Sequence, residues 1–228
     1  MQIVLLPGMD GTGILFEPLL KELSNDIEVQ VISQLIEYVK EKLPKEKAFV
    51  LVAESFSGPI GYAIASSPPD NLKSVVFVST FISPPNATLW LVSKLPLALF
   101  LKIPIPLPII KWFMLGKNIE SHIISLFRKS LKMVKTGILA HRIKEMAKLR
   151  GGGKRIGVKC VYIAAKNDKL ISYRHVEEFR ILAPNIEVVE IAGPHFIMQA
   201  KPKESAQVLK NLIANRKAGY VDPIDGSL

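Results

Sequence analysis

The chain has 228 residues, of which 49% are apolar and 22% charged, and its formal net charge is +10. This composition excludes a disordered chain, a coiled coil and a collagen, and it supplies enough apolar side chains for a buried core. The single cysteine, Cys160, excludes a disulfide scaffold and a Cys-rich zinc site. No signal-peptide pattern and no uncharged apolar stretch of membrane-spanning length is visible, so the sequence predicts a cytoplasmic protein.

The first predicted strand covers residues 3–6 and leads into a glycine-rich loop, PGMDGTG, at residues 7–13. Such a loop can direct backbone N–H groups into a site, and it can equally be a plain strand-to-helix turn. A phosphate-binding loop is disfavoured because both the G-x-G-x-x-G pattern and the P-loop lysine are absent. A helix is predicted to follow over residues 16–23.

The second predicted strand, residues 27–32, alternates apolar and polar side chains, which is typical of a half-exposed strand at the edge of a sheet. The next predicted helix covers residues 35–43. Only Ser33 and Gln34 separate the two elements, which is short for a crossover connection.

The third predicted strand, residues 49–53, is apolar throughout and runs into the sequence AESFSG. A nucleophile elbow has a serine at a sharp turn between a strand and a helix, with small residues around it. Ser55 has Ala53 before it and Ser57 and Gly58 after it, so small side chains stand near the glycine positions of G-x-S-x-G. An ordinary helix start rich in Ser and Gly is the alternative interpretation. The helix is predicted over residues 58–65.

After a fourth apolar strand at residues 74–78, the pattern changes. Residues 83–150 contain no convincing strand; they begin rich in proline and continue with helical periodicity from about residue 118 to Val134. Gly137 is predicted to break that helix before another that runs through Met146. We interpret residues 83–150 as a helical cap inserted into a core made of residues 1–82 and 151–228.

The charge is concentrated in and next to this insertion. Residues 83–155 hold fourteen Lys or Arg and two Glu, a net charge of +12, which leaves −2 for the rest of the chain. The insertion also carries both tryptophans, Trp90 and Trp112, among many aliphatic side chains. Packing over the core explains these apolar residues most simply, and binding of an acyl chain or peripheral contact with an anionic membrane are further hypotheses. No nucleic-acid-binding motif accompanies the charge, so nucleic acid is not expected as a partner.

The fifth predicted strand, residues 159–164, is followed by an acidic turn, KNDKLIS, that contains Asp168. A helix is predicted over residues 173–182. The sixth strand, residues 186–191, alternates like the second and leads into GPHF, which contains His195, before a helix over residues 203–216. Taken singly, Asp168 is also compatible with a capped turn, and His195 with a structural histidine. The structural or solvated interpretation is preferred for the other histidines, which are His122, His141 and His175.

The strand and helix pattern predicts an α/β fold with a mainly parallel sheet. Because the second and sixth strands alternate, they belong at the edges, which favours the order 2-1-3-4-5-6. Ser55, Asp168 and His195 each follow the carboxyl end of a strand, where open α/β sheets place their sites. Chance is a poor explanation for three such residues at one sheet edge in the order Ser, Asp, His.

Over nearly its whole length the chain resembles the α/β-hydrolase superfamily. The resemblance rests on four motifs in order, which are PGMDGTG, AESFSG, KNDKLIS and GPHF. The leading strand pair of that family is missing, and small residues replace the glycines of the elbow. The PG-x-DGTG opening is also similar to that of some ester-forming enzymes and lipid-acyl hydrolases.

The resemblance implies acyl transfer through a Ser-His-Asp triad without a metal or an organic cofactor. Ser55 would be the nucleophile, His195 the general base and Asp168 the residue that orients the imidazole. The N–H groups of Met9 and Phe56 would form the oxyanion hole. The resulting expectation is an esterase or lipase-like hydrolase for small-molecule or lipid esters with apolar acyl chains. An acyltransferase or thioesterase with the same triad, or a non-catalytic lipid carrier, remains an alternative, and the oligomeric state is open.

Overall fold

The computed structural model describes residues 1–23, 25–32, 36–86, 88–97 and 106–217. Within these residues, six parallel strands form one sheet in the order β2-β1-β3-β4-β5-β6, which confirms the predicted order. The short connection at Ser33 and Gln34 lies outside the described residues. The strands are β1 (Gln2–Leu6), β2 (Glu28–Val31), β3 (Phe49–Glu54), β4 (Leu72–Val78), β5 (Lys159–Ala165) and β6 (Glu187–Ile191).

Burial follows the strand order. All residues of β1 and β3 are buried, whereas β2 and β6 are mostly half-buried or exposed. A central strand of a parallel sheet has helices on both faces, so the side chains along it are mainly apolar, with polar residues such as Gln2 and Glu54 at the strand ends. An edge strand leaves polar side chains at the rim, which is the reason for the alternating sequences of β2 and β6.

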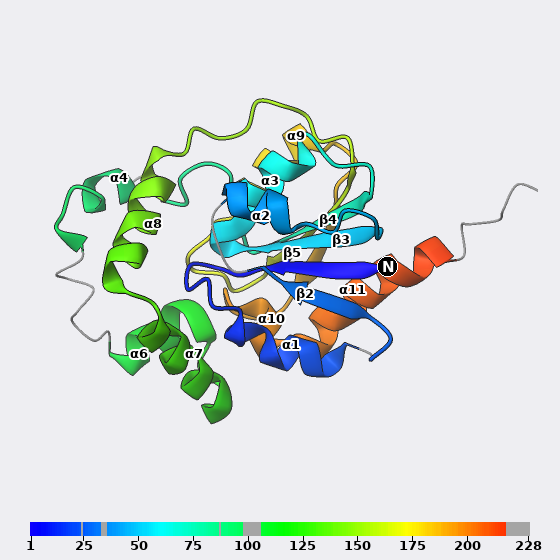
Figure 1. Cartoon of the computed structure of the whole chain (residues 1–228). Helices are drawn as coiled ribbons and strands as arrows, with labels where there is room; N and C mark the ends of the chain where they lie inside the picture. Colours follow the sequence, from blue (N-terminus) through cyan, green and yellow to red (C-terminus); the bar gives the residue numbers. More distant parts are fainter. Residues whose placement is uncertain (24, 33–35, 87, 98–105, 218–228) are drawn as a thin grey trace, which may run out of the picture.

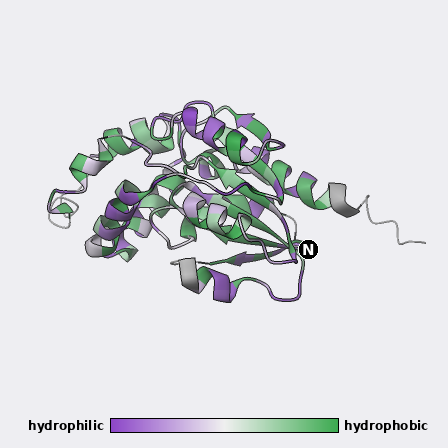
Figure 2. Cartoon of the chain, turned by 90° about the horizontal axis from the view of Figure 1, so that it is seen from above, coloured by the Kyte–Doolittle hydropathy of each residue, from purple (hydrophilic) through white to green (hydrophobic). Residues whose placement is uncertain are grey.

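Helices cover both faces of the sheet (Figure 1). Alternate strand residues separate into two cores: Val4 and Leu51 pack with one set of helices, and Ile3 and Val50 with the other. Figure 2 shows the green, hydrophobic strands between the mixed surfaces of these helices. The first set is α2 (Ile36–Lys42), α3 (Gly58–Ala65) and α9 (Arg174–Leu182), and the second is α1 (Glu17–Glu22), α10 (Ile197–Ala200) and α11 (Pro202–Lys217), with η1 (Ile14–Phe16) leading into α1.

The segment between β4 and β5, which we call the cap segment (residues 83–150), has no strand in its described part. Its helices gather beyond the carboxyl ends of the strands (Figure 1). They are α4 (Leu89–Val92), α6 (Leu107–Ile110), the π-helical η3 (Lys111–Leu115), α7 (Ser121–Met133) and α8 (Thr136–Lys148).

The predicted break at Gly137 is wrong by a few residues. Gly137 lies in the first turn of α8, and the chain leaves helical geometry at Val134 and Lys135, whose ψ angles are 126° and 134°. Glycine is tolerated in a first helical turn, and the extended backbone of the two preceding residues makes the corner. In the part of the chain that the structure describes, no helix is long and apolar enough to span a bilayer.

Candidate active site

Ser55 occupies a sharp turn between β3 and α3. It begins the 3₁₀ turn η2 (Ser55–Ser57), and its φ of 47° lies in the left-handed region that a non-glycine residue rarely adopts. Such strain persists only where the surroundings enforce it. The turn therefore has the backbone geometry of a nucleophile elbow, with the serine at its tip.

The small residues around Ser55 are required by close packing. A Cβ at Gly58 would lie 1.8 Å from Thr80 Oγ1, and one at Gly61 would lie 2.7 Å from the Cβ of Ala53. In the G-x-S-x-G pattern, the second glycine stands two residues after the serine, whereas here it stands three residues after, at Gly58. Gly58 is the position that Thr80, just after β4, approaches most closely. Ser57 instead donates its hydroxyl hydrogen to the carbonyl of Pro7.

Ser55, His195 and Asp168 are brought together as the sequence predicts. Ser55 Oγ lies 2.9 Å from His195 Nε2, and His195 Nδ1 lies 2.8 Å from Asp168 Oδ2. The side chains of His195 and Asp168 expose only 4% and 5% of their surface. The other carboxylate oxygen, Asp168 Oδ1, accepts hydrogen bonds from the N–H groups of Leu170 (2.8 Å) and Ile171 (2.9 Å).

The geometry suits one arrangement of protons. A carboxylate at Asp168 can only accept, so it pairs with a hydrogen on His195 Nδ1 and leaves Nε2 as the acceptor for the Ser55 hydroxyl. The two backbone donors hold the carboxylate in place. Chemically, the three side chains can move a proton from Ser55 to His195 while Asp168 stabilises the resulting imidazolium.

The PGMDGTG loop runs beside the serine. A Cβ at Gly8 would be 3.6 Å from the Cβ of Ser55, which places the loop against the elbow. The loop is held by its own contacts: Asp10 Oδ2 accepts from the N–H of Thr12 at 3.0 Å, and the N–H of Gly11 donates to Gly8 O at 3.1 Å. Met9 follows Gly8 on this loop and Phe56 follows Ser55 on the elbow, and their oxyanion-hole role stays a prediction.

Arg142 reaches from α8 of the cap segment onto this loop, and sequence reasoning missed it. Its guanidinium donates to Met9 O and lies 5.7 Å from the ring centroid of Phe56. Gly11 has a φ of 66°, which favours glycine, and a Cβ there would also displace the Arg142 guanidinium, which lies within 2.5 to 2.9 Å. Burial lowers the pKa of Arg142, while the carboxylate of Asp10 opposes that shift. The cap segment thus contacts both residues predicted to form the oxyanion hole.

Glu54, immediately before the serine, is a second residue that sequence reasoning missed. Its side chain is buried, and it accepts a hydrogen bond of 3.0 Å from Gln199 Nε2. Burial raises the pKa of Glu54 to about 7, although hydrogen bonds from Gln199 and the Gly8 backbone oppose the shift. Its carboxyl therefore joins the glycine-rich loop to α10, which follows the histidine loop. A charged residue at the end of an apolar strand was the signal that could have found it.

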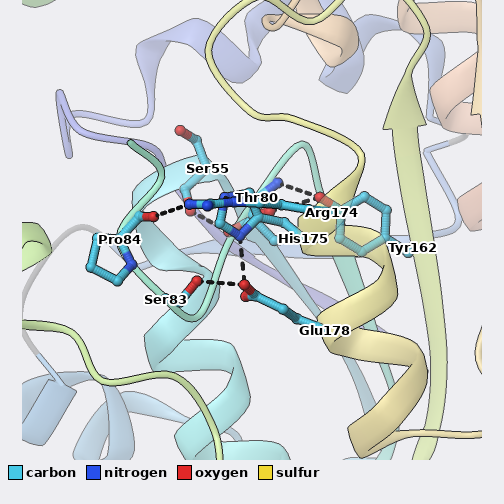
Figure 3. A network of polar contacts seen from close by, with 8 residues as sticks. All are labelled: Ser55, Thr80, Ser83, Pro84, Tyr162, Arg174, His175 and Glu178. Carbon is cyan, nitrogen blue, oxygen red and sulfur yellow. Dashed lines mark hydrogen bonds and ion pairs between the residues drawn. The ribbon is translucent and has the colours of Figure 1, made fainter. Parts of the chain in front are cut away.

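A polar network supports the elbow from behind (Figure 3). Thr80 donates its hydroxyl hydrogen to the carbonyl of Ser55, and its N–H donates to Tyr162 Oη at 3.0 Å. Tyr162 in turn donates to Thr80 O at 2.7 Å. Since Tyr162 lies within β5, these hydrogen bonds connect β5 to the residues that follow β3 and β4, next to the serine.

The same view shows where the cap segment leaves the core (Figure 3). Ser83 donates to Glu178 Oε1 at 2.6 Å, and Glu178 Oε2 lies 3.1 Å from Nδ1 of the fully buried His175. Arg174 donates to Pro84 O at 2.8 Å. His175 is therefore a structural histidine, whereas His122 and His141 are exposed.

An apolar cluster adjoins the loop and the elbow. Met9 and Phe56, the two residues predicted to supply the oxyanion hole, pack in it with side chains from the cap segment and from the end of β4. Its members come from segments far apart in the chain, so only folding brings them together. They are Met9, Phe56, Phe81, Leu89, Ile143, Met146, Leu149 and Ile171.

Trp90 and Trp112 lie on the outside, with 62% and 50% of their surface exposed. Trp90 is stacked by Lys94, whose Nζ is 5.6 Å from the ring centroid, and Trp112 by Lys169 at 2.9 Å. Lys169 follows Asp168, so Trp112 lies beside the acidic turn. Binding of substrate by either tryptophan stays a prediction.

The described residues also include a cysteine and side chains of the types that bind metals. Cys160 is buried in β5, and burial raises the pKa of its thiol to about 12, which makes it inert at neutral pH. Among the described residues, no group of three or more His, Cys, Asp or Glu side chains could hold a metal ion.

No protein-family model and no curated protein matches the sequence, but many solved structures share its fold. A lipase-esterase related protein from Clostridium acetobutylicum is 16% identical with a TM-score of 0.75, and covers 92% of this chain and 93% of its own. A thermophilic esterase from Thermogutta terrifontis is 15% identical with a TM-score of 0.74, covering 94% and 90%. The enol-lactonase from Burkholderia xenovorans is 13% identical with a TM-score of 0.71, covering 93% and 91%.

The chain therefore has the α/β-hydrolase fold, as its sequence motifs predict. It shares this fold with esterases and other hydrolases at low sequence identity.

Proposed function

We propose that this protein is a serine carboxylic-ester hydrolase that acts through an acyl-enzyme. The observation that carries the proposal is the continuous contact from Ser55 Oγ to His195 Nε2 and from His195 Nδ1 to Asp168, at 2.9 and 2.8 Å. A serine with a left-handed φ at the tip of the turn adds the geometry of an exposed nucleophile.

In the first half of the reaction, Ser55 Oγ attacks the acyl carbonyl while its proton moves to His195 Nε2. The oxyanion of the tetrahedral intermediate accepts hydrogen bonds from the N–H groups of Met9 and Phe56. His195 then protonates the leaving alkoxide, which departs as an alcohol. In the second half, His195 takes a proton from water while the water oxygen attacks the acyl carbon. The second tetrahedral intermediate then breaks its bond to Ser55 Oγ, His195 returns the proton to that oxygen, and the carboxylic acid leaves.

The apolar cluster beside the elbow supports substrates with apolar acyl chains. Phe81, Leu89 and Met146 approach the loop and the elbow from three different segments and offer no polar group to an acyl chain. Burial of a methylene group contributes about 0.8 kcal/mol. An acyl chain that packs against this cluster therefore gains affinity with each methylene group that it buries.

The first prediction concerns Ser55. Ser55→Ala is expected to lower kcat for p-nitrophenyl esters by about 10⁴- to 10⁶-fold, because the nucleophile is lost while the fold remains. The measurement is turnover of an acetate-to-palmitate series, with circular dichroism to confirm folding.

Ser57 supplies a matched control. A serine-reactive phosphonate is expected to label the natural chain and the Ser57→Ala variant but not Ser55→Ala, because the Ser57 hydroxyl is bound to Pro7 O. Labelling of Ser55 without ester turnover would point to an acyltransferase or thioesterase that needs its own acceptor. A folded chain that is never labelled would contradict the proposal and favour a carrier.

A further inference from the structure

The cap segment exposes large apolar side chains in two stretches. One stretch is α4 and the residues after it, and the other is α6 with η3, on either side of residues 98–105, which are not described. Leu91 exposes 63% of its surface and Phe113 44%. We name these residues the outer cap surface, which comprises Trp90, Leu91, Val92, Leu95, Ile109, Trp112 and Phe113.

Packing inside the cap segment does not account for this surface. The same short elements already bury other side chains inward: Leu89 joins the cluster beside the elbow, and Ile110 and Leu115 pack with α7 and Phe196. α7 and α8 each bury one apolar stripe and expose mostly polar and charged side chains, with Leu131, Met133 and Ile138 as exposed apolar exceptions. The elements of the outer cap surface thus carry apolar side chains toward the core and also toward solvent. On the solvent side, lysines lie over the rings of Trp90 and Trp112, while most of the aliphatic surface of Leu91 stays exposed.

The charge around the outer cap surface is basic. Lys94 Nζ lies over the ring of Trp90, and Lys117 and Lys169 lie over Trp112 at 5.4 and 2.9 Å. Residues 83–155 together carry +12. Tryptophan prefers the boundary between hydrocarbon and water, and lysine extends from apolar surfaces toward anionic head groups.

We infer that the outer cap surface docks onto the surface of an anionic lipid membrane. Aliphatic and aromatic side chains enter the head-group region, and the surrounding lysines contact lipid phosphates. A second copy of this chain is a poorer occupant, because a symmetric interface would bring two basic surfaces together. A nucleic acid would engage the lysines and leave Leu91, Val92 and Ile109 exposed.

The outer cap surface is connected to the candidate active site. Met114 of η3 accepts a hydrogen bond of 3.1 Å from the N–H of Phe196, the residue after His195. Lys169, which stacks on Trp112, follows Asp168. A docked chain would thus hold its histidine loop and acidic turn near the lipid. The further step, that membrane esters are the substrates, rests on the proposed function, whereas membrane docking does not.

The chain suits a direct test because Trp90 and Trp112 are its only tryptophans. Their fluorescence therefore reports on the outer cap surface alone. The full chain carrying Ser55→Ala is mixed with vesicles of phosphatidylcholine, with or without phosphatidylglycerol. We expect a blue shift and quenching by brominated lipids with the anionic vesicles only, weakened by salt. Since this variant cannot form an acyl-enzyme, the result is independent of the proposed hydrolysis.

Substitutions then locate the contact. Leu91→Ser and Phe113→Ser, which leave both tryptophans in place, are each expected to weaken vesicle binding by about tenfold. Ile181→Ser is the matched control, because Ile181 exposes 71% of its surface but lies on α9. Lys94→Glu should weaken vesicle binding more than Lys45→Glu, which reverses the charge of an exposed lysine outside the cap segment.

Three results would overturn the inference. The first is tryptophan emission that neither vesicle composition changes. The second is binding that Leu91→Ser and Ile181→Ser weaken equally. The third is a blue shift that appears without lipid as the protein concentration rises, with a dimer seen by sedimentation, since the occupant would then be a second copy. If a substituted variant fails to fold, quenching by brominated lipids in the chain with an unchanged outer cap surface still shows whether that surface contacts lipid.

Discussion

At the scale of single residues, Glu54 is a carboxyl group whose burial beside the serine makes its charged form unfavourable. Its carboxyl is buried next to the serine and accepts from Gln199 at 3.0 Å. Desolvation is the main cause that raises its pKa to about 7. The nearby Asp10 carboxylate contributes to this rise, whereas the hydrogen bond from Gln199 and the charge of His195 oppose it. A buried carboxyl of this kind is neutral in acid and charged above neutrality.

The pH dependence of stability follows from this pKa. Between the usual value of 4.5 and about 7, the folded state binds the Glu54 proton and the unfolded state has lost it. The free energy of unfolding therefore falls as pH rises through this window, by about 3 kcal/mol in total at 1.36 kcal/mol per pH unit. Urea unfolding at pH 5 and pH 8 measures the difference.

Glu54→Gln is the matched variant, because an amide of the same shape does not ionise. It should flatten the decline in the free energy of unfolding between pH 5 and pH 8, while its amide oxygen still accepts the hydrogen bond from Gln199 Nε2. Parallel pH profiles for the variant and the natural chain would show that Glu54 is not the group that titrates.

At the scale of elements, glycines set how closely helices approach strand ends. Gly58 begins α3 where Thr80 and the Phe81 carbonyl leave almost no space, with the built Cβ at 1.8 and 2.8 Å from Thr80 Oγ1 and Phe81 O. Gly137 in α8 has nothing within 4 Å of its built Cβ. Both glycines are helical, so they differ in surroundings rather than in backbone geometry.

Alanine substitution should separate the two positions. Gly58→Ala is expected to destabilise the fold by about 3 kcal/mol and to lower kcat, because Thr80 also binds the Ser55 carbonyl. Gly137→Ala is expected to raise stability by up to about 1 kcal/mol, since it removes backbone freedom from the unfolded chain. Urea midpoints measure both, and equal effects at the two sites would contradict the packing argument.

At the scale of the whole molecule, the candidate acyl site exists only where the cap segment meets the core. Ile143 and Met146 come from α8, Phe81 from the end of β4, and Met9 from the glycine-rich loop. Arg142 fixes α8 against that loop through Met9 O. The packing of α8 against the loop therefore determines which apolar side chains an acyl chain would meet beside the elbow.

A larger side chain in this cluster should change substrate choice. Ile143→Trp is expected to lower kcat/KM for long-chain esters relative to acetate by about tenfold or more, because the larger ring occupies the position of distal methylene groups. Leu131→Trp, at an exposed site on α7, is the control. Ratios of kcat/KM across the ester series provide the measurement, and an unchanged ratio in Ile143→Trp would place the acyl chain elsewhere.

The sequence by itself determined the sheet and where its reactive residues lie. Strand periodicity reports which side chains face a helix or solvent, so β2 and β6 could be placed at the edges from their alternation alone. Because parallel strands end at one edge, the positions of Ser55, Asp168 and His195 after three strands also predicted their meeting. These signals are local, because each depends on only a few neighbouring residues.

Only the tertiary structure decided the contacts that surround these residues. Arg142 and Met9 are 133 residues apart, and Gln199 and Glu54 are 145 apart. No periodicity links such pairs, because their meeting depends on how the cap segment and α10 pack against the sheet. The missing glycine of the elbow has the same explanation, since the approach of Thr80 determines that Gly58, one position later, must lack a side chain.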